Sequence, residues 1–263
     1  MKTKFLLAGL AVCTSVAASA VEPLTESTFT EIIRQANVVA AATKVVTPAV
    51  TNEVFRVPDM VRTGPDSRLE MTAPDQTITR IGANAVFTFE PGERNIRLIR
   101  GSVLFHPPAG VGGGTVKYGG TAAAVLGTTM VCAVMWDGSF KIIVLEGEAT
   151  VTLANGESIE LKAGQMVVVT PDGDSFNPVE NVHLAKLVPH LLLVRGLTRL
   201  LSSMPLIEAA IQLQNQQIAA GQEFHFVSAG MAGDGFELIL DSFPDISLLN
   251  TLDYTTVFIS PVR

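Results

Sequence analysis

Apolar and polar residues alternate most clearly between residues 148 and 169. Apolar side chains occupy every second position from Ala149 to Leu153 and again at Ile159 and Leu161, on either side of Asn155-Gly156. A period of two is typical of a strand with one buried face. Asn-Gly is the favoured pair for a two-residue turn with positive φ at both positions. The segment therefore predicts a β-hairpin.

The same kind of pattern extends over residues 51–175. Asp137-Gly138 predicts a second such turn between two apolar runs, and Ala163-Gly164 leads into a further strand. Consecutive apolar residues at Ile142–Leu145 and Val167–Val169 indicate strands buried on both faces, as in two stacked layers. We therefore expect a mainly β fold, an antiparallel β-sandwich or β-roll. The expected strands are 76–81, 85–89, 96–105, 115–118, 129–136, 139–145, 148–153, 158–162 and 165–169.

The pattern differs on both sides of this β domain. Residues 21–50 read as a lead-in with a short helix over Phe29–Ala36, capped by Thr25, Ser27 or Thr28. Residues 176–222 show apolar positions three and four apart, which predicts a C-terminal helical extension divided at Pro189 and Pro205. Residues 223–263 form a tail with short strands expected at 236–240 and 254–259.

The first 20 residues resemble a secretory signal peptide. Lys2 and Lys4 precede the apolar run Phe5–Val12, and Ala18-Ser19-Ala20 provides a small-x-small cleavage site. The run is too short to span a bilayer, which needs about 20 apolar residues. We therefore expect cleavage after Ala20 and a periplasmic or secreted product with no membrane span after signal cleavage.

The net charge argues against a nucleic-acid partner, and the cysteine content argues against a reactive thiol. Without residues 1–20 the chain has 16 basic and 25 acidic residues, a formal charge of −9. Nucleic-acid binding needs clustered Lys and Arg, so no nucleic-acid partner is expected. Only Cys132 then remains, within an apolar stretch, and it is interpreted as a buried and unreactive thiol.

Five short motifs resemble those of FecR-type domains and follow one another in the family's order. They include the opening V-x-T-G-x-x-S segment and a central L-x-x-G-x-V strand, and each contains a glycine at a predicted turn or strand end. We interpret these glycines as architectural. The five segments are Val61–Glu70, Ile96–Val103, Thr121–Thr129, Val144–Val151 and Leu161–Gln165.

The resemblance implies an all-β periplasmic module that acts by binding. Typical FecR proteins carry a cytoplasmic anti-sigma region and one membrane span before this domain, and they relay signals from outer-membrane transporters. This chain begins with a predicted signal peptide instead, so it is more similar to the stand-alone secreted FecR-domain proteins.

No residues are assigned here to a catalytic, cofactor-binding or metal-binding site. The glycine-rich segment Gly110–Gly114 lacks the Gly-Lys-Ser/Thr of a phosphate loop and is interpreted as a flexible hairpin tip. Asp172 and Asp174 start like a calcium loop, but position twelve is His183. The histidines show no metal-ligand spacing. They are His106, His183, His190 and His225.

These observations favour a non-enzymatic protein-interaction or signalling module of the cell envelope. Its partner would be an envelope protein, which could add a strand to an exposed sheet edge. A structural or self-assembling envelope component is one alternative. A cell-envelope carbohydrate binder or hydrolase is another, and it is disfavoured by the low content of Trp and Tyr, whose rings stack on sugars.

Overall fold

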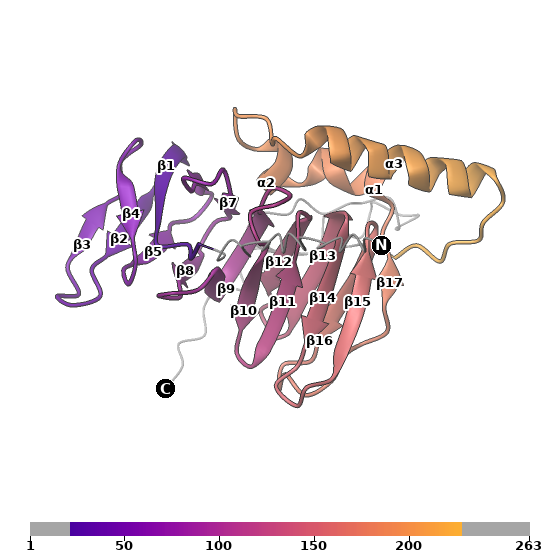
Figure 1. Ribbon diagram of the computed structural model, residues 1–263, viewed down its shortest axis with the longest axis horizontal. Helices are drawn as coiled ribbons and strands as arrows, with labels where there is room; N and C mark the ends of the chain where they lie inside the picture. The colour runs from indigo at the N-terminus through magenta and orange to yellow at the C-terminus, as the bar shows by residue number, and fades with distance from the viewer. Residues whose placement is uncertain (1–21, 228–263) are drawn as a thin grey trace, which may run out of the picture.

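Two β-sheets packed face to face form most of the computed structural model, which describes residues 22–227 (Figure 1). Short helices cover the outer face of one sheet. The expected mainly β fold with antiparallel sheets and a C-terminal helical extension is confirmed. The pairings between the named strands are antiparallel except that of β9 with β10.

The first sheet, called sheet A, has the strand order β4, β1, β6, β7, β9, β12, β13, β16, β17. Its strands are β1 (Glu26–Ile33), β4 (Val54–Arg56), β6 (Arg68–Thr72), β7 (Ile78–Ile81), β9 (Asn95–His106), β12 (Thr129–Val134), β13 (Phe140–Glu146), β16 (Gln165–Val169) and β17 (Glu180–Asn181).

The second sheet, sheet B, has the order β3, β2, β5, β8, β9, β10, β11, β14, β15. The strands not yet given are β2 (Ala36–Val39), β3 (Val46–Pro48), β5 (Met60–Thr63), β8 (Val86–Phe89), β10 (Gly114–Tyr118), β11 (Thr121–Val125), β14 (Glu148–Thr152) and β15 (Ser158–Lys162).

Strand β9 belongs to both sheets. Its first half pairs with β8 and β10 in sheet B, and its second half pairs with β7 and β12 in sheet A. The strand changes sheet at Gly101, which has φ +83°. A Cβ there would lie 2.5 Å from the Cβ of Ala85, so both the backbone angle and the space require glycine.

The core lies between the two sheets, and a second apolar cluster lies outside sheet A. In β12 and β13 consecutive side chains point alternately to these two layers: Ile142 and Val144 face the core, whereas Ile143 and Leu145 face the helices. Burial on both faces explains why Ile142–Leu145 is apolar throughout, as the sequence predicted.

The helices pack on the outer face of sheet A, along the upper side of Figure 1. They are α1 (Leu184–Leu187), the 3₁₀ helix η1 (Val188–His190), α2 (Leu192–Arg195) and α3 (Met204–Ala219). Pro189 lies in η1 and Pro205 in the first turn of α3, where a missing backbone N–H costs nothing. The division of the helices at these prolines is therefore confirmed.

The helix predicted over Phe29–Ala36 is wrong, because this segment forms β1 and the start of β2. β1 pairs with β4 on one side and β6 on the other. Thr28, Thr30 and Ile32 are β-branched residues, which favour a strand once neighbouring strands are available. Tertiary pairing therefore overrides the local capping signals.

The hairpin predicted at Asn155-Gly156 is confirmed, but its turn type is not. Leu153 donates its N–H to Glu157 and accepts from the N–H of Gly156. Only Gly156 has a positive φ in this loop, at +89°, so the loop has three residues and ends in a glycine bulge. The Asp137-Gly138 loop has the same form, with Gly138 at +87°.

The glycine-rich segment Gly110–Gly114 is not a hairpin tip as predicted. It leads from β9 into β10, which runs parallel to β9, so it is a crossover between sheets. The signal peptide at 1–20 and the tail strands at 236–240 and 254–259 lie outside the described residues. The domain boundaries at residues 20, 50, 175 and 222 remain predictions from the sequence.

Candidate interaction surface

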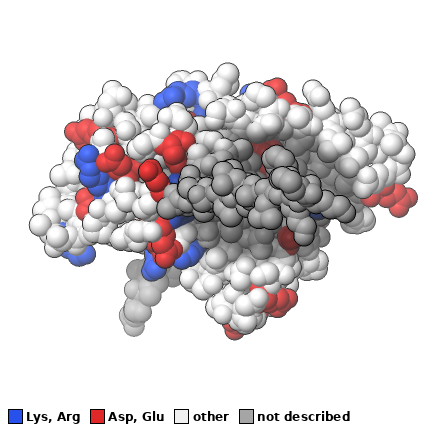
Figure 2. Space-filling view, viewed as in Figure 1, with Lys and Arg blue, Asp and Glu red and all other residues white. Residues whose placement is uncertain are grey.

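A groove of about 470 Å³ runs between α3 and the turns at one end of the sandwich. Leu206, Ala210 and Leu213 form its helical wall, four and three residues apart and thus on one side of α3. Both leucines are more than half exposed. Few charged side chains lie over α3 in Figure 2. The groove therefore offers an apolar wall to solvent.

The opposite side of the groove comes from the turns that join β13 to β14 and β15 to β16. Glu148 and Lys162 are opposite each other in the β14–β15 pair and stand at its rim. Phe224 also lines the groove and is stacked on Phe226, with ring centroids 5.3 Å apart. A peptide segment bound in the groove would contact leucines on one side and the oppositely charged Glu148 and Lys162 on the other.

Gln214 fixes α3 to the end of sheet A. Its Oε1 accepts the N–H of Leu184 at 2.9 Å, and its Nε2 donates to the carbonyl of Val182 at 3.0 Å. The side chain is buried beside Gly164, where a Cβ would lie 2.6 Å from Nε2. Gly164 therefore leaves room for the glutamine that positions the helical wall.

A buried polar cluster lies beneath the start of α3 and reaches the groove through Glu146. Thr129 Oγ1 lies 2.7 Å from Glu146 Oε1, 2.8 Å from Ser203 Oγ and 3.0 Å from His106 Nδ1. Because a hydroxyl has one hydrogen, Thr129 donates to one neighbour and accepts from another. The four side chains come from β9, β12, β13 and the N-cap of α3.

The two titratable groups of this cluster are shifted in opposite directions. Burial lowers the pKa of His106, although a hydrogen bond with the carbonyl of Thr128 opposes the shift. Burial raises the pKa of Glu146, and hydrogen bonds from Thr129 oppose it. Both shifts favour the neutral forms, so the 3.8 Å contact between the two groups is not a strong ion pair.

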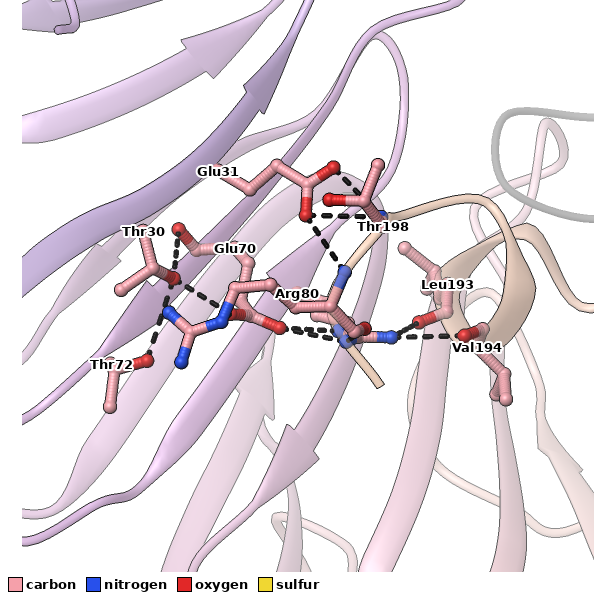
Figure 3. Close-up of polar contacts among 9 residues, drawn as sticks. Thr30, Glu31, Glu70, Thr72, Arg80, Leu193, Val194 and Thr198 are labelled. Carbon is pink, nitrogen blue, oxygen red and sulfur yellow. Dashed lines mark hydrogen bonds and ion pairs between the residues drawn. The ribbon is translucent and has the colours of Figure 1, made fainter. Parts of the chain in front are cut away.

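A second polar cluster attaches the helical layer to the β1–β6–β7 part of sheet A (Figure 3). Arg80 on β7 is fully buried and donates through Nε to Glu70 Oε2 at 2.9 Å. Its Nη1 donates to the carbonyls of Leu193 and Val194, each at 3.0 Å, and its Nη2 donates to the carbonyl of Arg199. One guanidinium therefore connects a strand with α2 and with the loop that follows it.

Glu31 on β1 holds the same loop from the other side. Its carboxylate accepts the N–H of Thr198 at 2.9 Å and the N–H of Arg199 at 3.2 Å. Burial raises the pKa of Glu31, but these hydrogen bonds outweigh it, and the net pKa is lowered. The carboxylate is thus ionised at neutral pH and fixes the loop that leads into α3.

Three of the four outer strands carry features that hinder the addition of a partner strand. Pro48 on β3 has no N–H to donate. On β15 the N–H of Lys162 is already bound by Gln165 Oε1 at 2.8 Å. Beside β17 the chain returns and forms a bridge between Asn181 and Phe226. Strand addition at these edges would therefore give few backbone hydrogen bonds.

The structure separates the residues that the sequence singled out for possible chemistry. Cys132 is buried in the core and burial raises its pKa, as expected of an unreactive thiol. His183 packs on Phe226. Within residues 22–227 no group of three or more His, Cys, Asp or Glu side chains is arranged to hold a metal ion.

Sequence reasoning missed both the groove and the two polar clusters. Their members lie far apart in the sequence, as with Glu70 and Arg199 or His106 and Ser203. The one available signal was the presence of polar residues inside apolar strands, as at Arg80 between Ile78 and Ile81. Such a residue requires a buried partner, but the sequence does not show which one.

Residues 59–150 match the family model described as FecR protein. Three of the five motifs lie wholly within this range, and a fourth, Val144–Val151, extends one residue past it. The fifth, Leu161–Gln165, lies beyond it, at the turn from β15 to β16. The match begins just before β5 and ends in β14, so it covers the strands on both sides of β9.

No curated protein matches the chain. Two crystal structures of a proposed anti-sigma factor from Parabacteroides distasonis are similar to it. One has 14% sequence identity and a TM-score of 0.44, over 75% of this chain and 91% of that one. The other has 16% identity and a TM-score of 0.41, over 46% of this chain and 59% of that one. Both likenesses are too distant to carry a functional argument.

Proposed function

We propose that this chain, whose residues 59–150 are a FecR-type domain, is a non-enzymatic interaction or signalling module that binds a protein partner in the cell envelope. The domain family suggests regulation through protein contacts. The observation that carries the proposal is the groove beside α3, because residues 22–227 leave Leu206 and Leu213 of its wall more than half exposed.

The construction of the groove supports a binding role. Gln214 and the loop held by Arg80 and Glu31 fix α3 on sheet A, so its exposed side is held in place before a partner arrives. A fixed surface loses less conformational entropy on binding than a mobile one. A partner that places apolar side chains against Leu206 and Leu213 would remove both from water.

The proposed location is the periplasm or the extracellular space, which depends on removal of residues 1–20 as a signal peptide. The helices described between residues 22 and 227 include none that is long and apolar enough to cross a membrane. The partner is expected to be an envelope protein.

Site-specific crosslinking tests the proposal. A photoreactive amino acid at Leu213 lies in the groove wall, whereas the same group at the exposed Asn215 lies on the far side of the same helix. Illumination of intact cells should give a discrete crosslinked product from position 213 and none from position 215. Mass spectrometry then identifies the partner.

Two results would contradict the proposal. One is the absence of crosslinked products at position 213 in cells that contain the folded protein. The other is the same set of products from positions 213 and 215, which would mean random contact. A Leu206→Asp substitution should also remove the product at position 213, since it places a charge in the apolar wall.

A further inference from the structure

Four exposed valines lie together in sequence at the end of the sandwich opposite the groove. They belong to β3, to β4 and to the segments beside them, and they are between 39% and 55% exposed: Val45, Val46, Val50 and Val54. This end of the molecule lies at the left of Figures 1 and 2, where charged side chains of both signs are also visible. We call these four residues the valine patch.

The backbone of β4 is open to pairing at the valine patch. Val57 donates its N–H to Thr25, and Phe29 donates to Glu53, so Phe55 directs its backbone groups toward β1. The N–H and carbonyl of Val54 must then point the other way, out of sheet A. Val54 itself is neither proline nor charged, whereas the shortness of β4 and the charged neighbours Glu53 and Arg56 limit how far such pairing can extend.

The edge of β3 offers only one outward N–H within the strand, that of Val46. Val46 and Pro48 are the residues whose backbone groups point away from β2, because Ala40 and Ala49 make the flanking hydrogen bonds to the opposite strand. Pro48 cannot donate. On β4, by comparison, both Val54 and Arg56 direct an N–H outward, so we place the pairing at β4.

From this geometry we infer that the valine patch binds a second copy of this chain, with β4 antiparallel to its symmetry mate about a two-fold axis at Val54. An antiparallel pair centred on one residue is self-complementary, since each Val54 N–H donates to the carbonyl of the other. The same operation brings the valines of both copies together. The rim carries both charge signs, with Lys44 and Glu53, which allows a copy to face itself.

The contact is expected to be weak. Stable interfaces bury about 800 Å² on each partner, and four part-exposed valines with two backbone hydrogen bonds provide less. The dimer should therefore form in a concentration-dependent way. This surface is separate from the groove beside α3, so its test and the crosslinking test at Leu213 can fail independently.

Sedimentation equilibrium over rising concentration tests the inference. The mature chain, residues 21–263, should approach twice its monomer mass by about 1 mM. Val54→Lys should keep it monomeric, whereas Val179→Lys, at a valine that is 41% exposed outside the patch, should not. A chain that stays monomeric, or a dimer that survives Val54→Lys, would overturn the inference. Circular dichroism confirms that each variant is folded.

Disulfide trapping tests the two-fold arrangement directly. In hydrogen-bonded antiparallel pairs the Cα atoms lie about 5.5 Å apart, within the range that a disulfide spans. Val54→Cys should give a covalent dimer on mild oxidation, and Val179→Cys should not. The mature chain's own Cys132 is buried and does not compete. Equal trapping at both positions would contradict the two-fold contact.

Discussion

Arg80 is a charged side chain with no exposure to solvent, and its partners define what its loss would do. Glu70 and the carbonyls of Leu193, Val194 and Arg199 would all lose a donor. Removing one member of a buried ion pair costs about 3–5 kcal/mol, because the other charge remains buried without compensation. We predict that Arg80→Met lowers the free energy of unfolding by that amount in urea denaturation.

Arg97 provides the matched control. It pairs with Glu90 at 2.7 Å, but its own side chain is largely exposed. Exposed ion pairs contribute about 0–1 kcal/mol, so Arg97→Met should change stability little. Similar losses for both variants would show that the buried cluster is not what anchors the helical layer.

His106 and Glu146 predict an unusual dependence of stability on pH. The folded protein keeps His106 neutral, so protonation of the unfolded chain below its ordinary pKa of 6.5 reduces stability. The folded protein binds a proton on Glu146 more tightly than the unfolded chain does. Stability therefore rises as pH falls through the raised pKa toward the ordinary 4.5. The two effects oppose each other.

Single substitutions should separate these two effects. In Glu146→Gln only the titration of His106 remains in this cluster. The variant should therefore lose stability on acidification below about pH 6.5. His106→Gln leaves the carboxyl of Glu146, and the variant should gain stability as the pH falls through the raised pKa of Glu146 toward about pH 4.5. Urea midpoints at several pH values, compared with the unmodified chain, measure both slopes. If the urea midpoints of the two variants changed with pH in the same way, the opposed pKa shifts of His106 and Glu146 would be ruled out.

At the scale of elements, β9 depends on Gly101 to change sheets. A side chain there would have to adopt φ +83° and would overlap Ala85. The backbone strain costs about 1–2 kcal/mol and the overlap about 1–3 kcal/mol. We predict that Gly101→Ala lowers the free energy of unfolding by about 3 kcal/mol. Gly92→Ala, at φ +77° with open space around it, should cost only about 1 kcal/mol.

Elements with local signals could be predicted, and those that depend on distant pairing could not. The hairpin at residues 148–162 was found because its alternation and its glycine lie within one short segment. The strand at Glu26–Ile33 was missed, since its partners are β4 and β6 and its own sequence also suits a helix cap. The crossover at Gly110–Gly114 was missed because the direction of β10 is set by β9.

At the scale of the whole molecule, sheet A needs the helices to cover its outer face. Leu104, Val131, Ile143 and Leu145 lie beneath them. A chain that ends at Asn177 would expose this layer, and contiguous apolar patches of that kind promote association. We predict that this truncated chain binds a hydrophobic dye strongly and aggregates, while the intact chain does neither.

A second truncated variant serves as the control. With Val131, Ile143 and Leu145 all changed to threonine, the exposed face becomes more polar and dye fluorescence should fall. Strong dye binding that persists in this variant would place the exposed apolar surface elsewhere in the molecule.

The candidate surface shows the limit of sequence reasoning for the whole molecule. The FecR-type motifs could be located because they are local and ordered along the chain. The groove could not, because Leu213 and Lys162 come to line one groove only after α3 packs on sheet A. The valine patch was also missed: the sequence has four valines within ten residues there, but it does not show that they are exposed.

The position of β9 in the chain also sets an order of events during synthesis. Strands β7 and β8 both pair with β9. Until β9 is available, each of these two strands therefore has an edge without a partner. After β9 emerges, β10 and β12 add to its other sides. We therefore expect a partly folded stage in which β7 and β8 have unpaired edges. At this stage the two strands are the most accessible to proteases and to pairing with other chains.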